Sequence, residues 1–283
     1  MLRRRPRPEL YLAGSAVFHY VGPSFAVLLF ARVEVLGVAW LRIASAALVF
    51  AVWRRPWRVV GGLGSGGWRL LLAWGAVLAA MNCCFYEAID RLPLGTVAAI
   101  EFLPVIALAA LGARSTRNAA ALALAVGGVA LLSDVQLTGS PLGFAFALAN
   151  AALFALYIVL AHRAARDRAM SGLSGLGAAM LVALVLVTPA GGWQVLPVLG
   201  APLVLLAGVG VGISSSVIPY VTDQLAMARL PRSTYSLMVA LLPATAVVVG
   251  VIVLGQLPGP AELLAVALVI AGVAVHRDPA APV

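Results

Sequence analysis

Four polar side chains stand inside long apolar runs of this sequence, where they could bind a charged small molecule. Arg42 lies nine residues past the start of the run 33–53, and Glu101 lies nine residues past the start of the run 92–112. His19 and Asn150 lie nine residues into the runs that begin at residues 10 and 141. At about 1.5 Å per helical residue, all four would reach a layer about 14 Å deep. Ionisable groups at such depth in a membrane are costly and usually functional.

A guanidinium and a carboxylate at one depth have two interpretations. In the first, Arg42 and Glu101 form a buried ion pair that only orients the helices. In the second, Glu101 receives a substrate ammonium or a proton, and Arg42 binds a substrate carboxylate through its two-pronged fork. Both interpretations remain open from the sequence alone.

Proline residues interrupt three of the apolar runs; they are Pro104, Pro219 and Pro243. Proline has no N–H, so it frees the carbonyl four residues earlier, which for Pro219 is that of Ser215. Freed carbonyls at membrane depth are tolerated only against protein or a wet cavity. Ser215, Ser216 and Tyr220 are therefore candidate substrate contacts, and a simple kink with locally satisfied hydroxyls is the alternative.

The composition requires that membrane helices position these residues. Of 283 residues, 63% are hydrophobic and 10% are charged, and the mean hydropathy is +1.06. A soluble protein is about half apolar and about a quarter charged, so a soluble globule is excluded. The 19 basic residues are all arginine and lie between the apolar runs. This arrangement indicates membrane topology and argues against nucleic-acid binding, which needs a contiguous basic face.

Ten apolar windows are long enough, or nearly so, to cross a hydrocarbon core of about 30 Å as helices. They are residues 10–30, 33–53, 68–89, 92–112, 118–134, 141–161, 174–190, 198–225, 232–254 and 261–275. The sequence thus predicts an all-α polytopic membrane protein with ten transmembrane helices. Alternating these spans from an inside N-terminus places almost all arginines on one side, as the positive-inside rule requires. We expect both termini in the cytoplasm.

The two halves of the chain share a short motif. Ala, Arg, Leu and Pro of residues 88–93 recur at residues 226–231, and Pro104 and Pro243 follow at similar distances. The repeats would span residues 10–134 and 141–276, with five helices each. Because five is odd, the second repeat enters the membrane inverted, a plan typical of secondary transporters with a midplane site between the halves.

Several segments resemble a known family. Residues 85–89 (Phe-Tyr-Glu-Ala-Ile) and 92–102, together with residues 215–220 and 229–232, are similar to EamA-type members of the drug/metabolite transporter superfamily, especially the threonine/homoserine exporter branch. Two positions depart from that branch: Leu242 precedes Pro243 where a Glu is usual, and Gln256 follows Leu254-Gly255 where a Glu is usual. The resemblance implies proton-driven efflux of small amino acids or related metabolites.

We therefore expect a secondary active exporter in the cytoplasmic membrane that works by alternating access, with a small-molecule substrate and the lipid bilayer as partners. A membrane-embedded enzyme acting on lipids would need acids or histidines clustered at one interface, and the sequence spreads them. A non-transporting membrane subunit is the other alternative. No cofactor or metal is expected, since Cys83 and Cys84 are adjacent and the glycines of residues 62–67 lack a flanking strand. The oligomeric state is not encoded in any motif.

Overall fold

The computed structural model describes residues 8–112, 115–167, 170, 172–227 and 242–275, and in these residues the regular structure is helical, without a strand. The N-terminal arginines, the repeat residues 228–231, Leu241 and the C-terminal residues from His276 lie outside the described part. The predicted span 232–254 is therefore described only from Leu242.

The first half of the chain contains α1 (Pro8–Leu29), α2 (Val35–Arg54), α3 (Trp57–Val60), α4 (Ser65–Arg91), α5 (Leu94–Gly112) and α6 (Thr116–Gly139). The second half contains α7 (Pro141–Arg166), α8 (Leu173–Val187), the π-helical turn η1 (Thr188–Gly192), the 3₁₀ turn η2 (Trp193–Val198), α9 (Pro202–Gly212), the π-helical turn η3 (Ile213–Val217), α10 (Ile218–Met227), α12 (Leu242–Leu254) and α13 (Pro260–Val275).

The helices follow the predicted spans closely, and α2 and α5 agree with them to within two residues at each end. Five stretches are long and apolar enough to cross a membrane: Val35–Arg54, Ser65–Arg91, Pro141–Arg166, Leu173–Val198 and Pro202–Thr222. Shorter apolar helices occupy the other predicted spans, so the count of ten transmembrane helices stays a prediction. The short helix α3 lies in the predicted loop, and α4 already begins at Ser65 within its glycine run.

Local sequence signals explain several helix ends. Ser140 caps α7, since its hydroxyl accepts a hydrogen bond from Gly143 N at 3.2 Å, and Pro141 occupies the first turn. Gly255 stops α12 with φ 65°, a left-handed conformation that glycine adopts without strain. The first signal marks the start of α7 and the second the end of α12, and both lie near predicted membrane boundaries.

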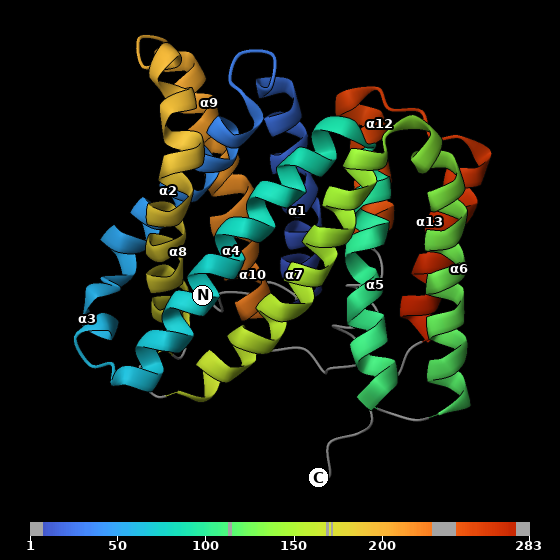
Figure 1. Cartoon of the computed structure of the whole chain (residues 1–283), viewed down its shortest axis with the longest axis horizontal. Helices are drawn as coiled ribbons and strands as arrows, with labels where there is room; N and C mark the ends of the chain where they lie inside the picture. The colour runs from blue at the N-terminus through green and yellow to red at the C-terminus, as the bar shows by residue number, and fades with distance from the viewer. Residues whose placement is uncertain (1–7, 113–114, 168–169, 171, 228–241, 276–283) are drawn as a thin grey trace, which may run out of the picture.

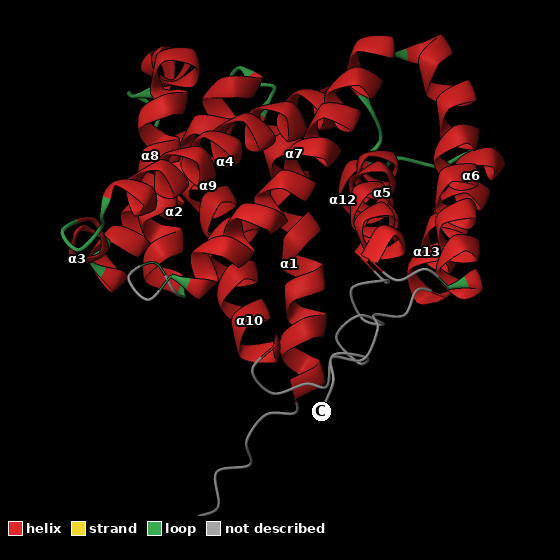
Figure 2. Ribbon diagram, turned by 60° about the horizontal axis from the view of Figure 1, so that its bottom comes forward, coloured by secondary structure: helices red, strands yellow, loops and turns green. Residues whose placement is uncertain are grey.

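The helices form one bundle in which α5, α6, α12 and α13 gather at one end and α2, α3, α8 and α9 at the other (Figure 1). Between them, α4 packs on α7 and α8, and α1 packs on η3, α10 and α12. The same grouping is visible from a second direction in Figure 2. Arg42 on α2 and Glu101 on α5 thus come from different groups of helices.

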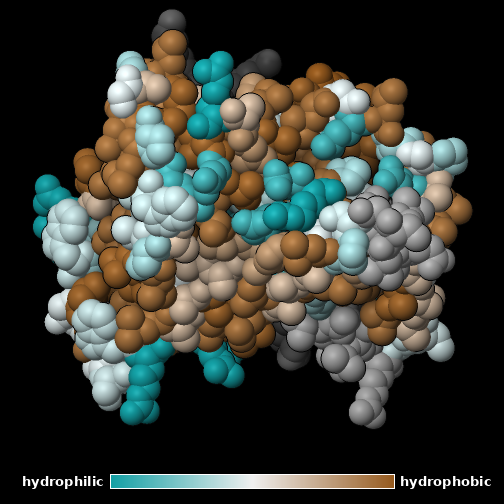
Figure 3. Space-filling model, turned by 45° about the horizontal axis from the view of Figure 1, so that its top comes forward, coloured by the Kyte–Doolittle hydropathy of each residue, from teal (hydrophilic) through white to brown (hydrophobic). Residues whose placement is uncertain are grey.

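The outer surface of the bundle is apolar. Val52 is 81% exposed, Leu203 79% and Ile252 75%. In Figure 3, apolar residues cover most of one face, and hydrophilic residues form separate groups. A soluble monomer rarely exposes so much contiguous apolar surface, so this surface fits the acyl chains of a bilayer. The chain is a multi-pass helical membrane protein.

Candidate functional site

Arg42 is held between three elements. On α2, its Nε donates a hydrogen bond to Ser216 Oγ at 3.0 Å, and its Nη2 donates to the carbonyl oxygen of Ser215 at 3.2 Å. The guanidinium carbon also lies 5.9 Å from the ring centre of Phe85 and 5.5 Å from that of Tyr86, both on α4. Cation–π contacts of this kind stabilise a charge that has lost water. The guanidinium is therefore fixed by η3 on one side and by α4 on the other.

Pro219 explains why a backbone carbonyl is available to Arg42. In a regular helix the N–H of residue 219 would donate to Ser215, but proline has none. The residues before it form the π-helical turn η3, and the freed carbonyl accepts from Arg42 instead. Pro219 itself is buried. The helix break predicted from the sequence thus has a defined structural consequence.

Gly22 allows α1 to approach η3 closely. A Cβ built at Gly22 would overlap Ser215 Oγ and would lie 2.8 Å from both Ser214 Oγ and Ser215 N. Any larger residue would push the serines away from Arg42. This glycine therefore sets the distance between α1 and the π-helical turn.

Glu101 forms a second polar group at the interface of α5 and α7. Its Oε1 accepts a hydrogen bond from Asn150 Nδ2 at 3.1 Å, and Asn150 is completely buried. Electrostatic interactions connect the carboxyl with Arg42 and with the buried Tyr20 on α1. Within the described residues, however, no ion pair joins Arg42 to Glu101. The structure therefore does not contain the ion pair of Arg42 and Glu101 on which the first interpretation depends.

The cluster keeps unused hydrogen-bonding capacity. Among the described residues, two of the five N–H donors of Arg42 have hydrogen-bond partners, and the buried Asn150 Oδ1 has none. The hydroxyl of Tyr86 lies near Arg42 and Ser215 without a hydrogen bond of normal geometry. Buried polar atoms are nearly always satisfied by protein, water or ligand. The arrangement can therefore accept a small polar molecule bearing both charges.

The structure brings two sets of predicted site residues together: Arg42 with Ser215 and Ser216, and Glu101 with Asn150. His19 lies half-buried on α1 with its ring 6.0 Å from that of Tyr20, and Tyr220 packs on the apolar cluster of α2, α4 and α8. Of the other predicted helix breaks, Pro104 lies three residues after Glu101 inside α5, and the α-helix continues through it to Gly112. Pro243 lies in the first turn of α12.

Sequence reasoning missed the uncharged residues that complete the cluster: Tyr20, Gly22, Phe85 and Tyr86. Phe85 and Tyr86 entered only as part of a family motif. Nothing in their type marks them as site residues, because aromatic residues and glycines are common in membrane helices. Their positions beside His19 and inside the resembling motif are the only signals available.

The helices, the apolar surface and the half-buried charged cluster define a class: a multi-pass membrane protein with a polar interior site. The model of the EamA-like transporter family matches residues 141–276. "Threonine/homoserine exporter RhtA" of Escherichia coli (strain K12) is 34% identical over 258 residues, 88% of this chain and 84% of that protein. The protein of the same name from Salmonella typhimurium (strain SL1344) is 32% identical over 271 residues, 91% of this chain and 88% of the other. The chain belongs to the EamA-like transporter family.

A solved crystal structure also resembles the chain, with a TM-score of 0.60 and 19% identity over 95% of each chain. At this identity the likeness concerns the fold alone. The helical architecture described above is therefore one that an experimentally determined protein also adopts.

Proposed function

We propose that this protein is a secondary active exporter of small amino acids such as threonine and homoserine across the cytoplasmic membrane. Two relatives named as threonine/homoserine exporters align over most of the chain, which supports the substrate class. The observation that carries the proposal is a guanidinium and a carboxylate on separate helices, both inside the bundle and not paired with each other.

An amino acid presents a carboxylate and an ammonium, and these groups match the two halves of the cluster. The substrate carboxylate binds the unused N–H donors of Arg42, whose planar fork suits a bidentate contact. The substrate ammonium binds Glu101 and the unpaired Asn150 Oδ1. Tyr86 and Ser215 supply hydroxyl groups near the carboxylate end for a substrate hydroxyl. Substrate thus completes a network that the protein leaves incomplete.

Coupling to protons is assigned to Glu101. Its carboxyl can hold either a proton or the substrate ammonium, so the two occupy the same position in turn. Exchange at one carboxylate is a simple way to couple inward proton movement to outward amino-acid movement. His19, on the neighbouring helix α1, is a second candidate in the proton path.

Alternating access follows from two inverted repeats, residues 10–134 and 141–276. In these repeats α1 corresponds to α7, α4 to α10, and α5 to α12. The helix packing supports this correspondence, because α4 packs on α7 as α10 packs on α1. In the same way, α5 packs on α7 as α12 packs on α1. A bundle with such internal symmetry can rock one half against the other around a central site. Both termini are cytoplasmic in this arrangement.

Two glutamines of the second half join it to the first at the predicted external end. Gln194 Oε1 accepts from Gly37 N at 2.7 Å at the start of α2, and Gln256 Oε1 accepts from Leu94 N at 3.0 Å at the start of α5. Both bonds must break before the two halves separate on that side. These two bonds support a conformation in which the proposed external end is closed.

Growth of a sensitive host under toxic homoserine or threonine tests the proposal. Cells that express the parent should tolerate the amino acid, and cells that express Arg42→Ala or Glu101→Ala should not. Arg163→Ala and Glu34→Ala are matched controls, because both side chains are exposed and outside the cluster. Full protection by both cluster variants, at equal amounts of protein in the membrane, would refute the site. No protection by the parent against either amino acid would refute the substrate class.

A further inference from the structure

We propose a second binding site, separate from the transport cluster: an arginine-lined pocket at the end of α2 that binds the phosphate group of an anionic ligand, with the headgroup of an anionic phospholipid as the expected source. The pocket has a volume of about 820 Å³. Its lining residues are Val52, Trp53, Arg54, Arg55, Arg58, Val59 and Ser174. None of them contributes to the cluster around Arg42 and Glu101.

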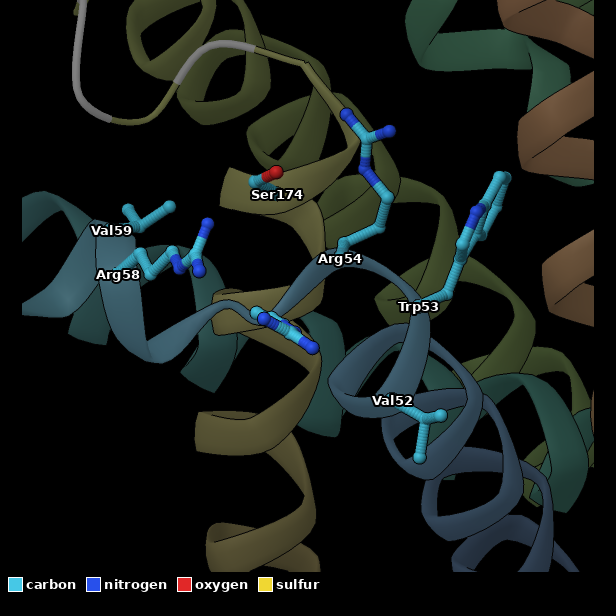
Figure 4. A pocket seen from close by; sticks show the side chains of 7 residues that line it. Val52, Trp53, Arg54, Arg58, Val59 and Ser174 are labelled. Carbon is cyan, nitrogen blue, oxygen red and sulfur yellow. The ribbon is translucent and has the colours of Figure 1, made fainter.

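Three elements build the pocket. Arg54 and Arg55 end α2, Arg58 lies on α3, and Ser174 lies in the first turn of α8. In Figure 4, Arg54 and Arg58 lie on either side of Ser174. Arginine binds phosphate oxygens through its fork with charge-assisted hydrogen bonds. Ser174 lies more than a hundred positions from the three arginines in the sequence, so the pocket is a product of the fold.

The charges in this pocket have no acidic partner among the described residues. Arg54, Arg55 and Arg58 are exposed, and no acidic residue in the described ranges forms an ion pair with any of them. Arg91, in contrast, contacts both Glu87 and Asp90. Three unpaired guanidinium groups around one hollow create a positive potential that attracts an anion.

The start of α8 also favours an anion. Gly172 precedes α8 and provides no side-chain cap, so among the described residues no side chain caps the N–H groups in this first turn. The positive end of a helix of 15 residues thus faces the pocket.

The surroundings of the pocket place it at a membrane surface. Val52 is 81% exposed, and Trp53 and Trp57 are 51% and 56% exposed. Tryptophan is enriched where acyl chains meet headgroups. Arg54 stacks on Trp53 with its guanidinium carbon 5.5 Å from the ring centre. Basic pockets between helices at this depth fit anionic headgroups, and the arginine-rich side is the one on which such lipids are abundant.

Native mass spectrometry of the purified full chain tests the site with two lipids, phosphatidylglycerol and phosphatidylcholine. The variant Arg54→Gln/Arg58→Gln removes two pocket charges, and Arg69→Gln/Arg163→Gln removes two exposed charges elsewhere. The parent and the control pair should bind phosphatidylglycerol more tightly than phosphatidylcholine. The pocket pair should lose about 30-fold of its affinity for phosphatidylglycerol, because each arginine near an anionic surface contributes about fivefold. If the pocket pair does not fold, Arg58→Gln alone replaces it, with Arg69→Gln as control.

A second arm distinguishes the source of the phosphate. Inorganic phosphate is added to the protein in phosphatidylcholine nanodiscs, and the thermal unfolding temperature is measured. If only the pocket pair loses the preference for phosphatidylglycerol over phosphatidylcholine, the result supports the site with lipid as the source of the phosphate. A phosphate-induced rise in unfolding temperature that only the pocket pair loses supports the site with a soluble source. Equal losses in the pocket and control pairs, or a parent with neither phosphatidylglycerol selectivity nor a phosphate-induced rise in unfolding temperature, would overturn it.

Discussion

At the scale of single residues, the site depends on Arg42 and Glu101 having separate partners. A direct ion pair would use up the charges that a zwitterionic amino acid needs. Instead Arg42 bonds to Ser215 and Ser216, and Glu101 bonds to Asn150. Neutral partners orient a charged group without cancelling its charge. In the proposed mechanism, the cluster therefore keeps one positive and one negative group for the substrate.

Replacing Glu101 by Gln should abolish proton-driven export. Gln keeps the size of the side chain and an oxygen for Asn150 Nδ2, but it cannot bind a proton or attract an ammonium as a carboxylate does. We expect export by membrane vesicles under an imposed pH gradient to fall at least about tenfold, since one charge-assisted bond contributes about 1.5–3 kcal/mol.

The amount of inserted protein should not change in this variant, and Glu34→Gln is the control because Glu34 is exposed. Undiminished pH-driven export by Glu101→Gln would remove Glu101 from the coupling mechanism.

Sequence reasoning could find the charged members of this cluster because charge is rare inside an apolar run and depth is countable along a helix. It predicted Arg42 and Glu101 in one layer of the membrane, and this shared depth stays a prediction. It could not find Tyr20 or Tyr86, since which face of a helix a ring occupies depends on packing between helices distant in sequence. The role of every site residue stays a prediction.

At the scale of elements, irregular turns shape the site. The π-helical turn η3 links α9 to α10 and presents Ser215 and Ser216 to Arg42. Such turns occur often at functional sites. Pro219 favours the irregular turn, because in a regular helix the carbonyl of Ser215 would have no N–H donor at position 219. The proline was readable from the sequence, and the π geometry was not, since it depends on the fit of η3 against Gly22 and α2.

Replacing Pro219 by Ala should reduce transport without destabilising the fold. An alanine N–H can bond to Ser215 O, which favours a regular helix and moves the serines away from Arg42. We expect transport to fall by about tenfold while the unfolding temperature stays the same or rises, because proline inside a helix costs about 3 kcal/mol. Pro189→Ala, at an exposed position in η1, should leave transport unchanged. A destabilised Pro219→Ala protein with normal transport would contradict this role of η3.

Gln256 should hold the external end of the bundle closed. Gln256→Ala removes the acceptor of Leu94 N, and an unsatisfied buried donor costs about 1–3 kcal/mol. Thr96 is 2% exposed and lines a small pocket of about 180 Å³ together with Gln256, so Thr96→Cys in a Cys83→Ala/Cys84→Ala background reports opening. We expect an impermeant maleimide to label it at least about fivefold faster in Gln256→Ala.

The matched control is Gln256→Glu, which keeps an acceptor and places a negative charge at the start of α5, where a helix favours it. It should label as slowly as the parent. Equal rates in all three proteins would show that this hydrogen bond does not restrain the external end.

At the scale of the whole molecule, membrane insertion and helix positions followed from the sequence, because apolar length is a direct requirement of the bilayer. Helix α6 runs beyond its predicted end to Gly139, and α8 continues through two irregular turns to Val198. Hydropathy could not locate these ends, since helices extend past the hydrocarbon core into the interface. Nor could it predict α3, whose four residues are too few to give a periodic pattern.

The predicted orientation places Leu257 outside the cell. Leu257 is 85% exposed between α12 and α13. In the background without Cys83 and Cys84, Leu257→Cys in intact cells should react with an impermeant maleimide, and Arg163→Cys should react only after the membrane is permeabilised. The reverse pattern would show that the chain inserts with its termini outside.

The most direct test of the central claim is counterflow in proteoliposomes loaded with unlabelled threonine and diluted into labelled threonine. The parent and Arg163→Lys should accumulate label transiently. Arg42→Lys should lose most of this uptake at low substrate, by about tenfold or more, because an ammonium keeps the charge but cannot make the fork contacts of a guanidinium. Arg42→Lys uptake equal to that of the parent would contradict a transport site built around Arg42.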